Sequence, residues 1–165
     1  MSDKQEARRQ FIEDAGDTLE EHGLPHMAGR VLGALMICVP PQMSMNELAE
    51  QLQASKGSIS SATQMLLRLG IIEKISMPGH RRHYYRPRAN LWSDLFTLRT
   101  EHLNRHHALA DQGLRAIADE PLEMKERLFE MQVFFDFVEK EIPGFAQRWE
   151  KQRPQLLKKR LALYK

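Results

Sequence analysis

The segment from Ser44 to Arg88 constrains the fold of this chain most, because it contains two helical patterns and then two extended ones, with short breaks between them. Ser44 and Glu47 have the spacing of a capping box, which marks a helix N-terminus. A short polar turn containing glycine, Gln53 to Gly57, follows this first helix. The next apolar residues then recur on one side of a helix, at positions Ile59, Ala62, Leu66 and Leu69.

Two extended runs follow Gly70, covering Ile71 to Ser76 and Arg82 to Pro87. The four residues Met77 to His80 place proline second and glycine third, which fits a type II turn. The pattern therefore predicts a β-hairpin directly after the second helix. Helix, turn, helix and hairpin in this order predict a mainly α fold of the winged helix-turn-helix type.

The second helix has a polar side opposite its apolar side. Its residues have short side chains or paired donors and acceptors, which suit hydrogen bonds to base edges and phosphates in a major groove. We interpret this helix as a DNA recognition helix. Its candidate contact residues are Lys56, Ser58, Ser60, Ser61, Gln64 and Arg68.

Positive charge is concentrated in the same segment. Residues 55–88 hold seven Lys and Arg against one acid, whereas residues 1–54 hold four against nine. The hairpin tip and its returning strand contribute His80, Arg81 and Arg82, which we expect at a phosphate backbone or minor groove. The alternative interpretation is a basic loop that contacts only solvent.

The rest of the chain predicts helices on both sides of this module. Residues 3–22 and 26–39 show amphipathic patterns, and Pro40-Pro41 ends the second of these helices. We expect further helices over 90–118, 121–141 and from Pro143 to the end, since proline favours a helix start. The predicted organisation is a dimerisation helix over 1–25, a DNA-binding module over 26–89 and a helical dimerisation region over 90–165.

The C-terminal helices carry more apolar surface than a lone helical arm can hide, which predicts pairing with a second copy. A homodimer sets two recognition helices about 34 to 36 Å apart, the spacing of successive major grooves in a palindromic site on double-stranded DNA. The residues concerned are Leu122, Leu128, Met131, Phe134, Phe135, Val138, Ile142, Phe145, Trp149, Leu156 and Leu157.

The chain resembles the MarR superfamily of bacterial regulators. The resemblance rests on the runs Met45 to Ala49, Ser55 to Ser60 and Leu69 to Ile72 and on the Arg81-Arg82 hairpin. Within the superfamily the chain is most similar to the GbsR branch, through Lys56 to Ser60 and the overall layout. The resemblance implies a cytoplasmic homodimeric transcriptional regulator, often a repressor, whose DNA affinity responds to a small-molecule effector.

Two clusters outside the module have alternative interpretations. His102 and His106 lie four residues apart, at metal-ligand spacing on one helix face. We nevertheless expect a solvated or interface role for them and no bound metal. Aromatic residues form either a core or dimer seam, or a cage for a choline-like effector. The candidate effector residues are Trp92, Phe96, Phe134 and Trp149.

Other functions find little support in the sequence. Phosphate-binding loops and nucleophile elbows are missing, so neither an enzyme nor a cofactor is expected. The single cysteine, Cys38, predicts a buried thiol in a reducing compartment, and no apolar run predicts a membrane span. A winged helix that docks an acidic protein partner through its basic hairpin, or a metal-responsive sensor, remains the alternative to a DNA-binding regulator.

Overall fold

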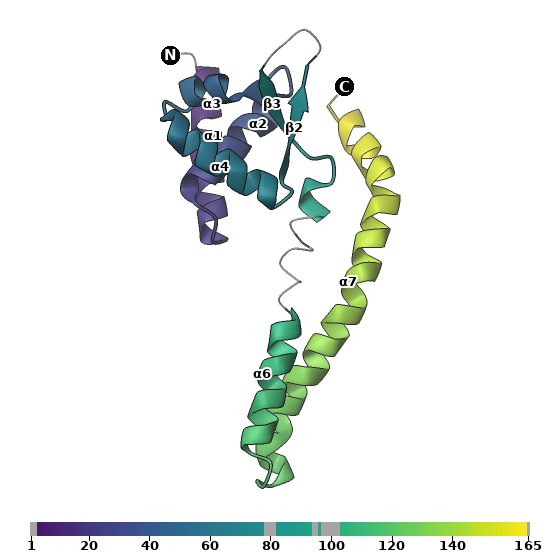
Figure 1. Cartoon of the computed structure of the whole chain (residues 1–165). Helices are drawn as coiled ribbons and strands as arrows, with labels where there is room; N and C mark the ends of the chain where they lie inside the picture. Colours follow the sequence, from purple (N-terminus) through teal and green to yellow (C-terminus); the bar gives the residue numbers. More distant parts are fainter. Residues whose placement is uncertain (1–2, 78–81, 94–95, 97–102, 165) are drawn as a thin grey trace. The chain divides into compact units, whose positions relative to one another are not determined.

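The computed structural model describes residues 3–77, 82–93, 96 and 103–164. The chain divides into two compact units, Met1–Leu91 and Trp92–Lys165. The first contains the predicted winged helix-turn-helix and the second is a pair of helices (Figure 1).

Helices α1 (Asp3–Glu21) and α2 (His26–Ile37) cross with almost no space between their backbones. A Cβ added at Gly29 would lie 2.7 Å from the Cα of Gly16 and still closer to the carbonyl oxygen of Ala15. Polar contacts join the same two helices: Arg8 donates to the carbonyl oxygen of Ile37 at 2.6 Å. Helix α1 is therefore an integral part of the first unit.

The core of this unit lies between α2, α3 (Met45–Gln51) and α4 (Lys56–Arg68). Of the four predicted apolar positions of α4, Ile59, Ala62 and Leu66 are buried and Leu69 is partly exposed. The residues below 9% exposure include Ala28, Val31, Leu32, Leu35, Leu48, Leu52, Ile59, Ala62 and Leu66. Helix α2 packs against the helix-turn-helix and supports it from behind.

A small antiparallel sheet completes the unit. Strands β2 (Ile72–Ser76) and β3 (His83–Pro87) form the predicted hairpin, with Ser76 opposite His83 and Ile72 opposite Pro87. Strand β1 (Met43–Ser44) pairs with the other edge of β3, giving the order β1-β3-β2. The sequence did not predict β1, because two residues are too few for an alternating pattern.

The predicted turn between the two short helices was wrong at its C-terminal end. Gly57 lies within the first turn of α4, and Ser55 is the N-cap, its Oγ accepting from the N–H of Ser58 at 3.1 Å. The positive φ of this turn, 49°, belongs to Gln53. A serine cap satisfies a free N–H group at the helix start, which is why α4 begins before the glycine.

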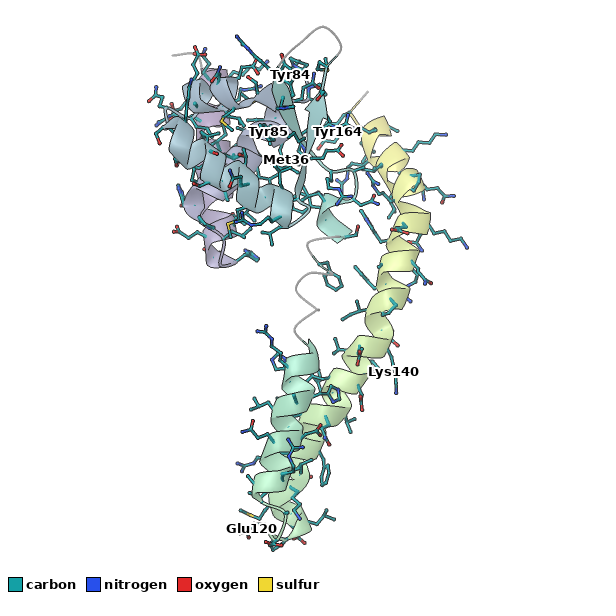
Figure 2. The ribbon with its side chains drawn as sticks, in the orientation of Figure 1. Met36, Tyr84, Tyr85, Glu120, Lys140 and Tyr164 are labelled. Carbon is teal, nitrogen blue, oxygen red and sulfur yellow. The ribbon has the colours of Figure 1, made fainter. Side chains whose placement is uncertain are left out.

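The second unit consists mainly of α6 (Leu103–Ala116) and α7 (Leu122–Ala162), which lie side by side over the first part of α7 (Figure 1). Residues 91–93 and 96 are also helical, in line with the helix expected over 90–118. Glu120 lies in the connection between α6 and α7 (Figure 2).

The predicted break at Pro143 was wrong, because α7 continues through both Pro143 and Pro154. A proline inside a helix loses one hydrogen bond and crowds the preceding turn, at a cost of about 3 kcal/mol. Its φ of about −65° is nevertheless helical, and long runs of strong helix formers lie on both sides. The helix therefore continues where the sequence rule placed a new start.

Candidate nucleic-acid interface

Helix α4 is held firmly on its apolar side. Ile59 and Leu66 are fully buried, and Thr63 between them is 1% exposed. The Thr63 hydroxyl donates to the carbonyl oxygen of Ile59 at 2.8 Å, so its burial leaves no polar group unsatisfied. This packing fixes which side of α4 faces outward.

The outward side carries the predicted contact residues. Lys56, Ser61, Gln64 and Arg68 are exposed, and Ser58 and Ser60 are partly exposed. Gln64 donates from Nε2 to the Ser60 Oγ at 3.3 Å, a contact that water or a base edge can replace. The side chains therefore form a polar surface backed by a rigid core.

The wing adds cations to this surface. Arg82 and Arg88 are exposed, whereas Arg86 donates from Nε to the Glu73 carboxylate at 2.6 Å. Glu73 is the one acid between residues 55 and 88, so Arg86 is already compensated and Arg82 is not matched by an acid of the hairpin. The other two predicted wing contacts, His80 and Arg81, lie outside the described residues.

The capping box at the start of α3 lies near the wing. The Ser44 N–H donates to Glu47 Oε2 at 2.6 Å, and the Glu47 N–H donates to Ser44 Oγ at 3.4 Å, which confirms the predicted motif. These hydrogen bonds with Ser44, and to a smaller extent the charge of Arg82, hold the pKa of Glu47 below its usual range. Glu47 thus stabilises the N-terminus of α3, the first helix of the helix-turn-helix.

Apolar anchors are missing from this surface. Over the described residues from Pro40 to Leu91, no large hydrophobic side chain is exposed. A protein-docking surface typically centres on such an anchor. The composition of the surface matches nucleic acid better than an acidic protein partner.

Arg30 and Arg8 are supporting residues that sequence reasoning missed. Arg30 donates from Nε to Glu13 at 3.0 Å and from a terminal nitrogen to the carbonyl oxygen of Leu52 at 3.1 Å, which joins α1, α2 and the end of α3. The one sequence signal for these two residues was that they are basic within an acidic segment. Their partners could not be predicted, because local periodicity does not show long-range pairing of charged residues.

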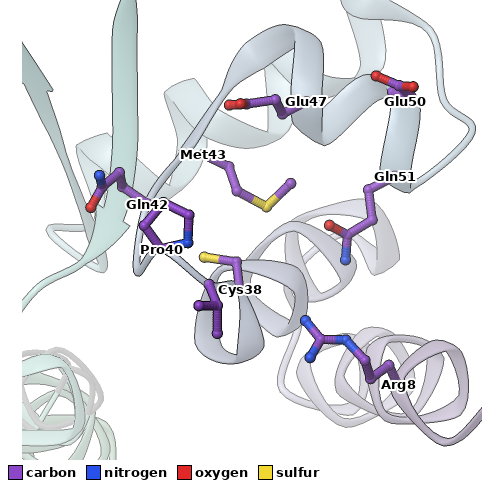
Figure 3. Close-up of a pocket in the computed structure, with 9 residues that line it drawn as sticks. Arg8, Cys38, Pro40, Gln42, Met43, Glu47, Glu50 and Gln51 are labelled. Carbon is purple, nitrogen blue, oxygen red and sulfur yellow. The ribbon is translucent and has the colours of Figure 1, made fainter. Parts of the chain in front are cut away.

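Cys38 lies at a cavity of about 410 Å³ that is lined from α1, α3 and the connection after α2 (Figure 3). Its Sγ donates to the carbonyl oxygen of Leu35 at 3.3 Å, and burial raises the pKa of the thiol. A protonated thiol is a poor nucleophile. The thiol is partly buried, whereas the sequence predicted a buried one.

Comparison with known proteins decides the family. The chain is 38% identical to the HTH-type transcriptional regulator MmpR5 of Mycobacterium tuberculosis over 130 residues, 79% of either chain. The chain belongs to the MarR family. The family model described as MarR family matches residues 22–83, and the one described as MmpR5-like MarR family transcriptional regulator matches residues 90–152.

Two further relatives agree with this assignment. A crystal structure of a transcriptional regulator is 35% identical, has a TM-score of 0.71, and covers 88% of this chain and 99% of that one. The HTH-type transcriptional repressor GbsR of Bacillus subtilis is 27% identical over 81 residues, 49% of this chain and 44% of its own. This MarR-family chain is a DNA-binding transcriptional regulator, and none of the described helices is long and apolar enough to cross a bilayer.

The aromatic residues predicted to bind an effector lie in the second unit of the MarR-family chain. The ring centroids of Phe96 and Phe145 are 4.8 Å apart, and Trp149 follows one turn along α7. Phe134 lies fifteen residues before Trp149, which is about 22 Å along a helix. Phe134 instead contacts Phe135 edge-to-face at 5.3 Å, so it is not part of the pair formed by Phe96 and Phe145.

Of the two histidines considered as metal ligands, the structure describes one, His106. His102 lies outside the described residues. The His106 ring stacks on Phe135 at a centroid distance of 4.3 Å, while His107 faces acidic side chains of α7.

Proposed function

We propose that this chain is a homodimeric repressor that reads a palindromic operator through α4 and holds its flanks through the wing. Ser58, Ser60, Ser61 and Gln64 contact bases in this proposal. Lys56, Arg68, His80, Arg81 and Arg82 contact phosphates or the minor groove.

The exposed polar side of α4 carries the proposal. It combines side chains that suit base edges with a buried side that prevents the helix from rotating. Guanidinium groups at both ends of the surface, on Arg68 and Arg82, supply favourable interactions with a polyanion. The charge difference between residues 55–88 and the rest of the chain supports the same orientation.

The proposed dimer rests on the apolar surface of the second unit. Phe134 and Phe137 on α7 are 57% and 61% exposed, and no described residue of α7 is buried. Burial of such residues against a second copy removes apolar area from water. Helix α1 contributes Phe11, which is 44% exposed, to the proposed dimer surface.

Three narrower points belong to the same proposal. An effector binds near Trp92, Phe96 and Trp149, with Phe134 as part of a separate aromatic group, and lowers the DNA affinity. The GbsR-like branch finds support in the 27% identical repressor, and the MmpR5 relative supports a different branch more strongly. The regulator acts in the cytoplasm, where DNA is accessible.

The test is selection from a pool of random duplexes by the full-length protein at several salt concentrations, with sequencing of the bound fraction. The proposal predicts an enriched palindrome with half-sites about one helical turn apart and a steep salt slope. Flat enrichment at every salt concentration would contradict it.

Variants assign the roles once a site is known. Gln64→Ala should cost about 1–3 kcal/mol on the selected site and relax preference at one position per half-site. Gln10→Ala on α1, which bonds Asp14, is the matched control and should leave the preference unchanged.

Arg82→Ala should weaken binding to all duplexes and reduce the salt slope by about one per protomer. Arg9→Ala removes an exposed arginine paired with Glu6 on α1 and should not change the slope. Equal slopes for wild type and Arg82→Ala would exclude the proposed phosphate contact.

A further inference from the structure

A polar strip runs along one flank of the α6–α7 helix pair. Asp111 accepts a hydrogen bond from the Gln132 amide at 2.6 Å. One turn earlier on α6 and one turn later on α7, His107 meets Asp136, with 3.2 Å between Nε2 and Oδ1. The partner on α7 thus moves forward by one turn as the residue on α6 moves back by one turn, as expected for two antiparallel helices.

Three metal-binding side chains meet at this level. Donor atoms of His107, Asp136 and Glu139 all lie within 4.8 Å of one another. Asp136 and Glu139 are three residues apart on α7, so they project from one side of that helix. Both carboxylates lie on α7, between Glu120 and Lys140 in the sequence, and these two residues are labelled in Figure 2.

The His107 Nε2 atom has no hydrogen-bond partner in the described structure, although it is shielded from solvent. The approach to Asp136 has the distance of an ion pair but not the geometry of a hydrogen bond. A buried polar atom without a partner costs free energy, and such atoms are rare in folded proteins. A ligand positioned between this nitrogen and the carboxylates removes that cost.

We infer that His107, Asp136 and Glu139 bind a divalent transition-metal ion between α6 and α7. Two ligands about 2.0–2.2 Å from Zn²⁺ in a tetrahedral arrangement are about 3.4 Å apart, close to the separation of Nε2 and Oδ1. Glu139 is exposed, so its carboxylate can rotate to close the third position. One imidazole and two carboxylates suit Zn²⁺ or Mn²⁺ and leave a position for water.

Neighbouring contacts hold α6 and α7 together beside the site. His106 stacks on Phe135, which anchors α6 to α7 directly beside the site. The hydrogen bond between Asp111 and Gln132 fixes the register one turn away. The bound ion joins two helices that otherwise meet through few buried residues. The inference does not depend on the operator or the effector.

The experiment is a Zn²⁺ titration of chelator-treated full-length protein by calorimetry, with Co²⁺ absorption as a report on coordination. The inference predicts one Zn²⁺ per chain. His107→Gln, Asp136→Asn and Glu139→Gln should each lower the affinity at least about tenfold, as expected when a site loses one of three ligands. Circular dichroism checks that each variant keeps its helices.

His106→Gln is the matched control, because it removes the adjacent imidazole, whose ring stacks on Phe135. It should keep wild-type Zn²⁺ affinity. The inference is overturned by absence of stoichiometric binding, by unchanged affinity in His107→Gln, or by loss of binding in His106→Gln alone. If His107→Gln loses helix content, the two exposed carboxylate variants decide the result.

Discussion

The two units of this chain bury apolar side chains very differently. In the first unit, residues from α2, α3, α4 and the sheet form a continuous core, and Val31, Leu48, Ile59 and Ile71 are fully buried. Among the described residues of the second unit, Ala110 is the one hydrophobic residue below 9% exposure. The first unit thus contains its own stabilising core, whereas the described helices of the second leave most of their apolar side chains at least partly exposed.

This difference matches the division of labour in the proposed regulator. A recognition helix needs a fixed orientation, which the core beneath α4 supplies. A dimerisation helix needs an apolar surface that is available until the partner binds, and α7 has that surface. Changes on α7 should therefore affect assembly, and changes under α4 should affect folding.

The largest expected effect comes from Phe137→Glu, which places a charge on the exposed apolar side of α7. Burial of an unpaired carboxylate in a dimer seam is strongly unfavourable. We expect monomers by sedimentation equilibrium and at least a hundredfold weaker operator binding. The control is Gln147→Glu, at an exposed polar position of the same helix, which should remain dimeric. If Phe137→Glu also remains dimeric, Phe137 does not lie in the dimer interface.

Gly29→Ala tests the first unit. The added Cβ meets backbone atoms of α1, which cannot rotate away, so we expect a loss of about 1–3 kcal/mol in the free energy of unfolding. Gly57→Ala is the control, since a Cβ there would make only an ordinary contact of 3.8 Å with the Ser55 Oγ, and α4 should gain up to about 1 kcal/mol. Urea denaturation measures both, and equal stability of the two variants would contradict the close crossing.

The smallest effect concerns the capping box. Because the pKa of Glu47 is lowered in the folded chain, its contribution to stability is present above the ordinary pKa of glutamate, about 4.3. That contribution is lost as the pH falls through the lowered value. Glu47→Gln should be less stable than wild type at pH 7, and the difference should shrink toward pH 3; a constant difference would argue against the charged contact.

Much of the winged unit was predictable because its signals are local. The capping box at Ser44 and the spacing from Ile59 to Leu66 each fall within a few residues, whereas most of the predicted turn over Met77 to His80 lies outside the described residues. The crossing at Gly29 and the bonds of Arg30 were not predictable, since both join segments far apart in the sequence. The α6–α7 register that brings His107 to Asp136 has the same long-range character.

Predictions failed where two local rules compete. Pro143 was expected to start a helix, but continuous helix formers on both sides override that signal. Gly57 was expected in a turn, but the Ser55 cap places it inside α4. The candidate DNA contacts on α4 were predictable in position because exposure follows the helix period, whereas the aromatic groups of α7 depend on partners that periodicity does not identify.

Hydrogen exchange of the wild type and Phe137→Glu, followed by mass spectrometry, tests the contrast between the two units most directly. We expect faster exchange throughout α7 in the variant, with unchanged protection in α2 and α4. Unchanged exchange in α7 would contradict burial of this helix against a second copy. Equal loss of protection in both units would contradict a winged unit that is stable without the dimer.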